Sequence, residues 1–509
     1  MQRVVAFGDV HGADRELVAL LTQAGVIDAA QHWSGGATHL VSVGDLIDRG
    51  SGSKAVLDLM MRLEDEAPRA GGYVHLVLGN HEAMNLAGDD RYASAEDDAT
   101  FADAHGTTSA PDPGEVPGQA QRRAALAIDG RYGAWLATHP MLIVIDDTAF
   151  VHGGLPAAVA SGDLVALNAR FHGDLLDAAR TPDAATADLL SETGPLWYRG
   201  TARCHALIEA PRLQRALDAL HARRVVVGHT PTRSGRALTR FDGGVVMIDT
   251  GMLAAAYHGR PSALVIEGGS MRVVVAGESA TKPPDADTGG YAGEWASVDA
   301  TAALLASAPI ASIEPTQTNG ARAVVLATPN GPVAARFAAL SKDQLRHEIA
   351  AYRLDRLLQL GFVAPAVDRV VDGKRGLLYV PDVDWMSERT RRERNLARSN
   401  DCESGTDYAL MLAFDALLGN DARSVDNLGY GRSLTELRLR DHGAAFRTST
   451  ALRSDPNAPP KLPPGLRATL ASLDERTLAA ALKEQLDSRE IKAVLARRDA
   501  IVRDWPTSE

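Results

Sequence analysis

Short apolar runs recur along the first half of the chain, and each ends at a segment rich in glycine, aspartate, asparagine or histidine. The runs occupy residues 4–7, 39–43, 74–78, 142–151 and 225–227, and further strand-like runs lie at 245–249 and 262–266. Between them, apolar positions recur with helical spacing, for example over residues 14–24, 53–63 and 206–222. The alternation predicts an α/β fold that carries its functional side chains on loops at the strand ends.

The segments that follow five of these runs share residue types that bind metal ions. They are residues 8–12 (GDVHG), 44–50 (GDLIDRG), 79–82 (GNHE), 152–154 (HGG) and 228–230 (GHT). Together they supply six candidate ligands: Asp9, His11, Asp45, Asn80, His152 and His229. Nitrogen and oxygen ligands without cysteine favour manganese, iron or zinc over calcium. We therefore predict two adjacent divalent ions, which clamp a phosphate and lower the pKa of a water molecule.

The same segments contain candidates for proton transfer and phosphate binding. His81 directly follows Asn80, and we predict that it donates a proton to the leaving oxygen as general acid. Asp48 is the candidate that holds the His81 imidazole in the correct tautomer. The guanidinium of Arg49 can bind two phosphate oxygens. We expect Arg199, in the aromatic segment 194–200 (GPLWYRG), to bind the same phosphate.

These motifs resemble those of the calcineurin-like metallophosphoesterases, and GDxxDRG with GNHE resembles the phosphoprotein phosphatase branch. Within it, residues 196–199 (LWYR) and 88–92 (GDDRY) resemble bacterial Shewanella-like protein phosphatases. The resemblance covers roughly residues 1–275. It implies a two-layer α/β sandwich, a dinuclear metal centre and hydrolysis of phosphomonoesters, with a phosphoprotein or a small phosphorylated molecule as substrate. Dinucleoside polyphosphate hydrolases share much of this motif set, so a nucleotide substrate is the alternative.

The second half begins after a proline- and glycine-rich stretch at residues 276–297, which we predict to be a linker. We predict short strands at 323–326 and 333–337, and helices over 342–360, 407–418 and within 464–503. With Glu348 on a helix and the DHG segment at 441–443, this order resembles the atypical kinases of the HipA-like and phosphatidylinositol-kinase-like groups. The resemblance implies a kinase-like α+β domain over residues 298–509.

In such kinases a helix glutamate, a loop asparagine and a later aspartate hold ATP and magnesium. The resemblance places Glu348, Asn427 and Asp441 in these roles. Two positions depart from the pattern: Arg336 stands where a lysine is expected, and Ala422 where the loop aspartate is expected. We therefore predict a kinase-like domain without kinase activity. A nucleotide-binding or partner-binding regulatory module, a working kinase and an unrelated helical domain are the alternatives.

Length and composition change this picture little. A chain of 509 residues predicts two or three domains, and its net charge of -12 argues against a nucleic-acid or membrane-surface partner. Cys204 and Cys402 lie far apart in sequence, and no disulfide can be inferred from them. With no apolar run of membrane-spanning length and a strand close to Met1, we expect a cytoplasmic protein in a reducing compartment. Residues 86–121 look like an insertion with a disordered or lid-like part. Its acidic stretch at 89–115 is more typical of a solvated loop than of a substrate-binding segment.

Overall fold

The computed structural model of the chain divides into two compact units. It describes residues 3–102, 116–161, 163–181, 189–232, 234–285, 298–318, 320–329, 331–381, 385–399, 401–402, 405–431, 434–452 and 459–507. Unit 1 comprises residues 1–202 and 212–286, and unit 2 comprises residues 203–211 and 287–509. Each unit has its own sheets and its own hydrophobic core.

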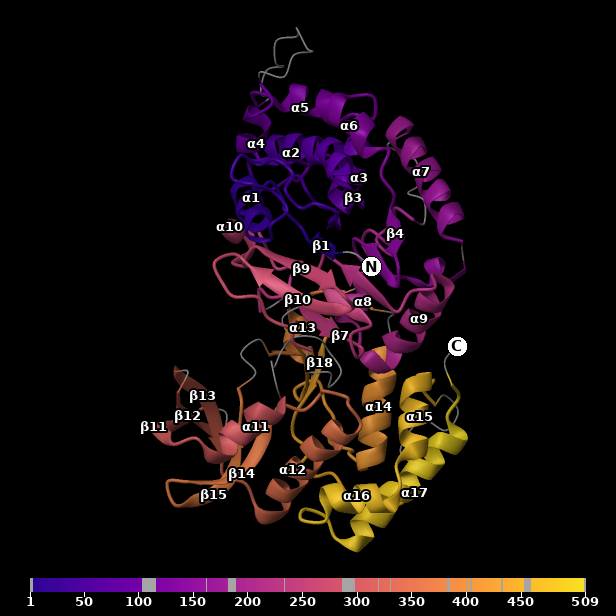
Figure 1. The fold of residues 1–509 in the computed structure, drawn as a ribbon. Helices are drawn as coiled ribbons and strands as arrows, with labels where there is room; N and C mark the ends of the chain where they lie inside the picture. The colour runs from indigo at the N-terminus through magenta and orange to yellow at the C-terminus, as the bar shows by residue number, and fades with distance from the viewer. Residues whose placement is uncertain are drawn as a thin grey trace. The chain divides into compact units, whose positions relative to one another are not determined.

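Two five-stranded sheets form the centre of unit 1 (Figure 1). The first sheet has the order β10-β9-β1-β2-β3, with bounds β1 Arg3–Phe7, β2 His39–Ser42, β3 Tyr73–Leu76, β9 Ser262–Glu267 and β10 Ser270–Val275. The second has the order β4-β5-β6-β8-β7, with bounds β4 Leu142–Ile145, β5 Thr148–Val151, β6 Arg224–Val227, β7 Leu238–Arg240 and β8 Val245–Met247. Strands β1, β2 and β3 are parallel, as are β5, β6 and β8, so the carboxyl ends of each set share one edge.

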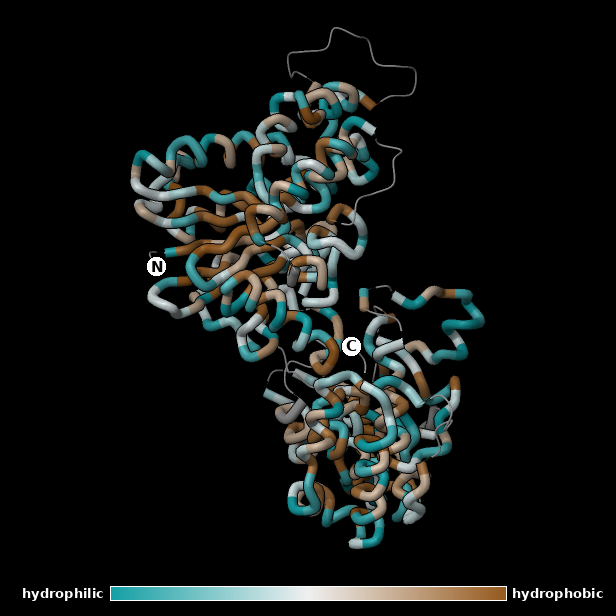
Figure 2. The backbone as a smooth tube through the Cα atoms, turned by 90° about the vertical axis from the view of Figure 1, so that its right-hand side faces the viewer, coloured by the Kyte–Doolittle hydropathy of each residue, from teal (hydrophilic) through white to brown (hydrophobic). Residues whose placement is uncertain are grey.

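The core of unit 1 lies between these sheets. Val4 and Val41 of the first sheet share one buried cluster with Phe150 and Val226 of the second. The intervening Val5 points to the opposite face of β1 and is also buried, which explains why the strands are continuously apolar rather than alternating. Figure 2 shows these hydrophobic strands running through the interior of the unit. The structure thus confirms the predicted two-layer α/β sandwich.

Helices of unit 1 follow the strands and cover the sheets. Their bounds are α1 Asp14–Gln23, α2 Ser53–Glu66, α3 Asn80–Leu86, α4 Ala95–Ala99, α5 Gln119–Leu126, α6 Arg131–Leu136, α7 Leu164–Arg180, α8 Gly200–Arg203, α9 Ala206–Ala219 and α10 Ala254–Tyr257, with 3-10 turns η1 Ala67–Ala70 and η2 Ala157–Ser161. Helices α1 and α2 pack together, and α2 also packs against β3. Residues 206–211 at the start of α9 cluster with unit 2.

Two segments of unit 1 differ from the sequence prediction. The apolar run at 142–151 forms the hairpin of β4 and β5, because Asp146 adopts a left-handed φ of 52° and turns the chain. Within the predicted insertion at 86–121, residues 103–115 lie outside the described residues. Its described parts include α4 and the first turn of α5, and Asp97 on α4 is fully buried.

Unit 2 combines an antiparallel sheet with a helical half. The five-stranded sheet has the order β11-β12-β13-β15-β14, and a smaller sheet has the order β16-β17-β18. The strands are β11 Ile310–Thr318, β12 Ala321–Thr328, β13 Gly331–Ala338, β14 Ala366–Val371, β15 Lys374–Tyr379, β16 Met386–Ser387, β17 Leu428–Tyr430 and β18 Leu437–Leu439. The helices are α11 Val298–Ser307, α12 Lys342–Leu357, α13 Glu388–Glu393, α14 Thr406–Leu418, α15 Pro464–Ser472, α16 Glu475–Leu482 and α17 Ser488–Asp504.

Helix α12 ends earlier than the apolar pattern predicts. Gln359 adopts a left-handed φ of 56°, and the backbone N–H of Phe362 donates to Asp355 Oδ1 at 2.9 Å. These features turn the chain back onto the helix, so Phe362 joins Leu354 and Phe414 in the core of unit 2. The predicted linker at 276–297 lies partly outside the described residues, namely at 286–297.

A disulfide between Cys204 and Cys402 lies within unit 2, with the two Cα atoms 5.5 Å apart. The sequence contained no sign of this pair, because 198 residues separate the two positions. The expectation of a reducing compartment rested on unpaired cysteines, so the disulfide removes its support. Among the described residues, no helix has both the length and the apolar character needed to cross a membrane.

Candidate active site

The carboxyl ends of five parallel strands bring the predicted motifs of unit 1 together. The loops after β1, β2, β3, β5 and β6 carry them. His11, Asp45, Asp48, Arg49 and His229 all have positive φ, between 48° and 70°. Such conformations are costly for residues with a side chain and cluster at functional sites. The turns after β1, β2 and β6 are therefore strained in a way that aims these side chains at one point.

Glycines beside these residues let the carboxylates lie directly on the backbone. A Cβ atom at Gly79 would lie 2.2 Å from Asp45 Oδ1, and one at Gly228 would lie 2.5 Å from Asp9 Oδ1. Any larger residue at either position would displace a carboxylate. The glycines of GNHE and GHT are thus required by the packing of the site.

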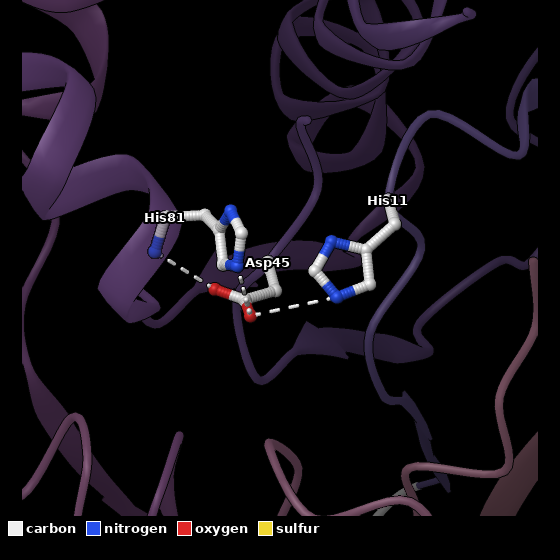
Figure 3. A group of neighbouring side chains, drawn as sticks. All are labelled: His11, Asp45 and His81. Carbon is white, nitrogen blue, oxygen red and sulfur yellow. Dashed lines mark hydrogen bonds and ion pairs between the residues drawn. The ribbon is translucent and has the colours of Figure 1, made fainter. Parts of the chain in front are cut away.

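His11, Asp45 and His81 form the first group of side chains able to hold a metal ion (Figure 3). Asp45 Oδ2 lies 3.7 Å from His11 Nε2 and 3.8 Å from His81 Nε2. His11 Nδ1 lies 3.1 Å from the carbonyl oxygen of Ile47. A carbonyl oxygen only accepts, so Nδ1 carries the proton and Nε2 presents a lone pair to the carboxylate.

Asp45, His152 and His229 form a second such group, so Asp45 belongs to both. His152 Nδ1 donates to the carbonyl of Val43 at 2.7 Å, which leaves the Nε2 lone pair 3.0 Å from Asn80 Oδ1 and 3.3 Å from Asp45 Oδ2. With Nε2 unprotonated, these are three electron-pair donors facing one another. Such an arrangement is unfavourable unless a cation lies among them.

An unpaired imidazole nitrogen and the neutral state of two histidines support the fit of this site to metal ions. His229 Nε2 is buried and has no hydrogen-bond partner among the described residues, while its backbone N–H donates to Asp9 Oδ1 at 2.9 Å. Burial lowers the pKa of His11 to about 3 and that of His229 well below its ordinary value, so both imidazoles are neutral ligands. The donor set therefore fits divalent cations.

Buried acids add negative charge that cations would neutralise. Burial and the neighbouring Asp249 raise the pKa of Asp9 well above its usual range, and burial raises that of Asp249 to about 6. Burial also acts to raise the pKa of Asp45, but His152 and His81 hold it well below the usual range. The sequence prediction did not include Asp249, because it stands in a plain Asp-Thr-Gly turn after β8.

His81 and Asp48 form the predicted pair. His81 Nδ1 lies 2.6 Å from Asp48 Oδ2, and both side chains are almost fully buried. Burial lowers the pKa of His81, but Asp45 and Asp48 outweigh it and raise the pKa overall. Its Nε2 lies 3.2 Å from Arg49 Nη2. This environment favours a proton-carrying imidazole, although the ring also belongs to the first metal-binding group.

A buried arginine that sequence reasoning missed holds Asp48 in place. Arg122 of α5 is 1% exposed and donates to Asp48 Oδ1, to Asn85 Oδ1 at 2.9 Å and to Asp97 Oδ2 at 3.0 Å. Asn85 in turn donates to Asp48 Oδ2 at 3.0 Å. Asp97 belongs to the stretch predicted to be a solvated loop, a prediction that is wrong for this buried residue, and Arg122 lies directly after the predicted insertion. Neither lies in a motif, and only folding brings them beside Asp48.

The two predicted phosphate-binding arginines lie close to the metal-binding groups. The Arg49 guanidinium lies 5.2 Å from the Tyr92 ring centre and 5.4 Å from that of Tyr257, contacts that limit its motion. Arg199 Nη1 donates to the carbonyl of His229 at 2.6 Å and to Thr230 Oγ1 at 3.2 Å. Each arginine is therefore anchored beside a candidate metal ligand.

Comparison with known proteins agrees with this geometry. Residues 2–233 match the family of calcineurin-like phosphoesterases. Shewanella-like protein phosphatase 2 of Arabidopsis thaliana is 30% identical over 295 residues, which cover 52% of this chain and 75% of the relative. The chain belongs to the calcineurin-like phosphoesterases. An uncharacterized protein of Schizosaccharomyces pombe is 31% identical over 273 residues, covering 52% of this chain and 76% of that protein.

This phosphoesterase also resembles solved phosphatase structures. A cold-active protein-tyrosine phosphatase of a psychrophilic Shewanella is 28% identical, with a TM-score of 0.46, over 55% of this chain and 80% of that chain. The family and its protein phosphatase homologues identify the chain as a phosphatase. Together with the two ligand groups around Asp45, they imply divalent metal ions.

In unit 2 of the phosphoesterase, two of the three predicted nucleotide-binding residues, Glu348 and Asn427, make hydrogen bonds within the protein. Glu348 Oε2 lies 3.4 Å from His442 Nδ1, next to Asp441 in sequence. Asn427 Oδ1 accepts from the backbone N–H of Ser424 at 2.7 Å, and its Nδ2 donates to the carbonyl of Ala422 at 2.9 Å. The asparagine therefore stabilises its own loop.

Two aspartates of unit 2 lie at or next to the positions compared with the kinase pattern. Asp421, next to Ala422, pairs with Arg447. Burial and Glu348 raise the pKa of Asp441. A proinflammatory kinase of Helicobacter pylori is similar over 38% of this chain and 93% of its own, with 12% identity and a TM-score of 0.26. These values do not show a shared fold, and the kinase-like interpretation of unit 2 stays a prediction.

Proposed function

We propose that the chain is a metal-dependent phosphomonoester hydrolase that acts on phosphoproteins, on phosphoserine, phosphothreonine or phosphotyrosine. One observation carries the proposal: the Asp45 carboxylate belongs to both groups of side chains able to hold a metal ion, and each group adds two histidines. Arg49 lies beside the first group, next to His81. Protein phosphatases among the relatives support this substrate class.

Six side chains would hold the two ions, which we expect to be manganese, iron or zinc. They are Asp9, His11, Asp45, Asn80, His152 and His229. When bound, two divalent ions supply Lewis acidity and lower the pKa of a water molecule. The protein's own contribution is to keep the imidazoles of His11 and His229 neutral, through burial. It also orients the rings of His11 and His152, through the carbonyls of Ile47 and Val43.

Arg49 and Arg199 bind and orient the phosphoryl oxygens through charge-assisted hydrogen bonds. His81 gives its Nε2 proton to the oxygen that leaves when the phosphorus–oxygen bond breaks. Asp48 accepts the Nδ1–H of the same ring and stabilises its charged form before that transfer. Arg122 holds Asp48 in place by donating to its Oδ1.

The test is hydrolysis by the full-length protein, with added manganese, of a phosphotyrosine peptide, a phosphoserine peptide and a dinucleoside tetraphosphate. His81→Asn is the control, and we expect it to lower turnover about 10²–10⁴-fold with metal content retained. Peptide hydrolysis that is lost in this variant supports a protein phosphatase. Activity on the dinucleotide alone would instead establish a nucleotide hydrolase, and near-normal turnover of His81→Asn would remove this residue from the mechanism.

For unit 2 we infer a nucleotide- or partner-binding role without phosphate transfer. The support is the alanine at position 422 and the engagement of Asn427 within its own loop. ATP binding by the full-length protein, weakened by Asp441→Ala, would support a nucleotide-binding module. Transfer of phosphate from ATP to a protein substrate would contradict the inference, and transfer that persists in Asp441→Ala would also exclude the role predicted for that residue.

A further inference from the structure

A cavity of about 900 Å³ opens beside Arg49 in unit 1. Its walls come from the segments directly after the first two metal-binding motifs, from α4 and from the start of α10. Its volume lies at the upper end of the range for small-molecule sites. We call it the flanking groove and define it by residues 12–16, 49–58, 94–100 and 253–256, which contain its lining residues.

The groove is continuous with the phosphate site because Arg49 lines both. Arg49 Nη2 lies 3.2 Å from His81 Nε2 on one side, and the same residue forms part of the groove wall. A phosphate bound by this guanidinium therefore places the remainder of its substrate at the mouth of the groove. In an extended peptide the next two residues lie about 3–7 Å along the chain from the phosphorylated one, within reach of this mouth.

The flanking groove carries a net negative charge when its ion-paired side chains and Arg49 are left out of the count. Lys54 pairs with Asp58 at 2.9 Å, and Arg49 faces the phosphate site. The remaining charged side chains of the lining are three carboxylates and one guanidinium: Asp14, Glu16, Glu96 and Arg15. Within the described part of the chain, the three carboxylates have no ion pair. The groove thus attracts a cationic group and repels an anionic one.

We propose that the flanking groove binds the polypeptide next to the phosphorylated residue and selects a lysine or arginine there. The proposal rests on the protein phosphatase function given above and narrows its substrate class. It also disfavours polyphosphate nucleotides, because their additional negative charges would lie against Glu16 and Glu96. Selection by such partly exposed charges amounts to about threefold to tenfold in kcat/KM and weakens as salt rises.

The experiment compares two phosphopeptides that differ only in lysine or glutamine beside the phosphorylated residue, with p-nitrophenyl phosphate as a substrate too small to reach the groove. The variant is Glu16→Lys combined with Glu96→Lys in the full-length, metal-loaded protein. Asp65→Lys is the matched control, because Asp65 is an exposed acid of α2 outside the groove lining.

We expect the unmodified protein and Asp65→Lys to prefer the lysine peptide about threefold to tenfold, and the double variant to lose or reverse this preference. Hydrolysis of p-nitrophenyl phosphate should be the same in all three proteins. Equal rates on both peptides in the unmodified protein, or an unchanged preference in the double variant, would overturn the groove's role while leaving the phosphatase function standing. Absence of hydrolysis of every substrate would overturn both.

Discussion

Replacing Arg122 with methionine tests the buried network beneath the catalytic pair. The substitution keeps the length and apolar stem of the side chain but removes the hydrogen bonds to Asp48, Asn85 and Asp97. Two buried carboxylates then lose their cation. Breaking a buried ion pair on one side costs about 3–5 kcal/mol, so we expect a loss of stability of that order.

The same substitution should impair proton donation. Asp48 keeps its bonds to His81 and Asn85 but loses the partner that fixes its second oxygen, so the imidazole becomes less well oriented. We expect kcat on a phosphoserine peptide to fall about tenfold to a hundredfold, part of the full contribution of a general acid. The fall should be smaller on p-nitrophenyl phosphate, whose leaving oxygen needs no proton.

The assay combines denaturant unfolding, metal content and kcat for both substrates. The control is Arg123→Met, because the neighbouring Arg123 is half exposed and pairs with Asp90 on the surface. We expect this control to behave like the unmodified protein. Two results would refute the link from Arg122 through Asp48 to proton donation. One is an unfolding midpoint of Arg122→Met equal to that of the unmodified protein. The other is an equal fall of kcat on both substrates with metal retained.

Three further predictions concern the metal centre and the stability of unit 2. Asp45→Asn should lower metal content and activity together, because Asp45 belongs to both ligand groups; metal analysis that shows two ions still bound would contradict this role. Burial raises the pKa of Asp355 to about 7. The folded state therefore holds a proton that the unfolded state releases near pH 4, and the free energy of unfolding should fall as pH rises from about 4 to about 7. Asp355→Asn should flatten that dependence in denaturant titrations, and an unchanged slope would show that this carboxyl does not cause it. Cys402→Ser should destabilise unit 2 by about 2–5 kcal/mol through loss of the bond to Cys204, and an unfolding midpoint equal to that of the unmodified protein would count against it.

The sequence alone was sufficient to predict the layered sheet and the loops that carry the candidate ligands. Valine-rich runs such as residues 4–7 and 225–227 are local signals, and an apolar run followed by glycine and a ligand residue indicates a strand end. Side chains at the ends of parallel strands meet because the sheet brings those ends to one edge. For this reason Asp9 and His229, 220 residues apart, could be assigned to one site before folding, and they are in contact.

Only the tertiary structure decided which other residues support that site. Arg122 reaches Asp48 across 74 residues, and Cys204 reaches Cys402 across 198, in each case through packing that no local pattern encodes. The partner of a buried charge depends on which helix covers which sheet. Motif chemistry is therefore readable along the chain, whereas the network that orients Asp48 and the cavity beside Arg49 arise only when distant segments pack together.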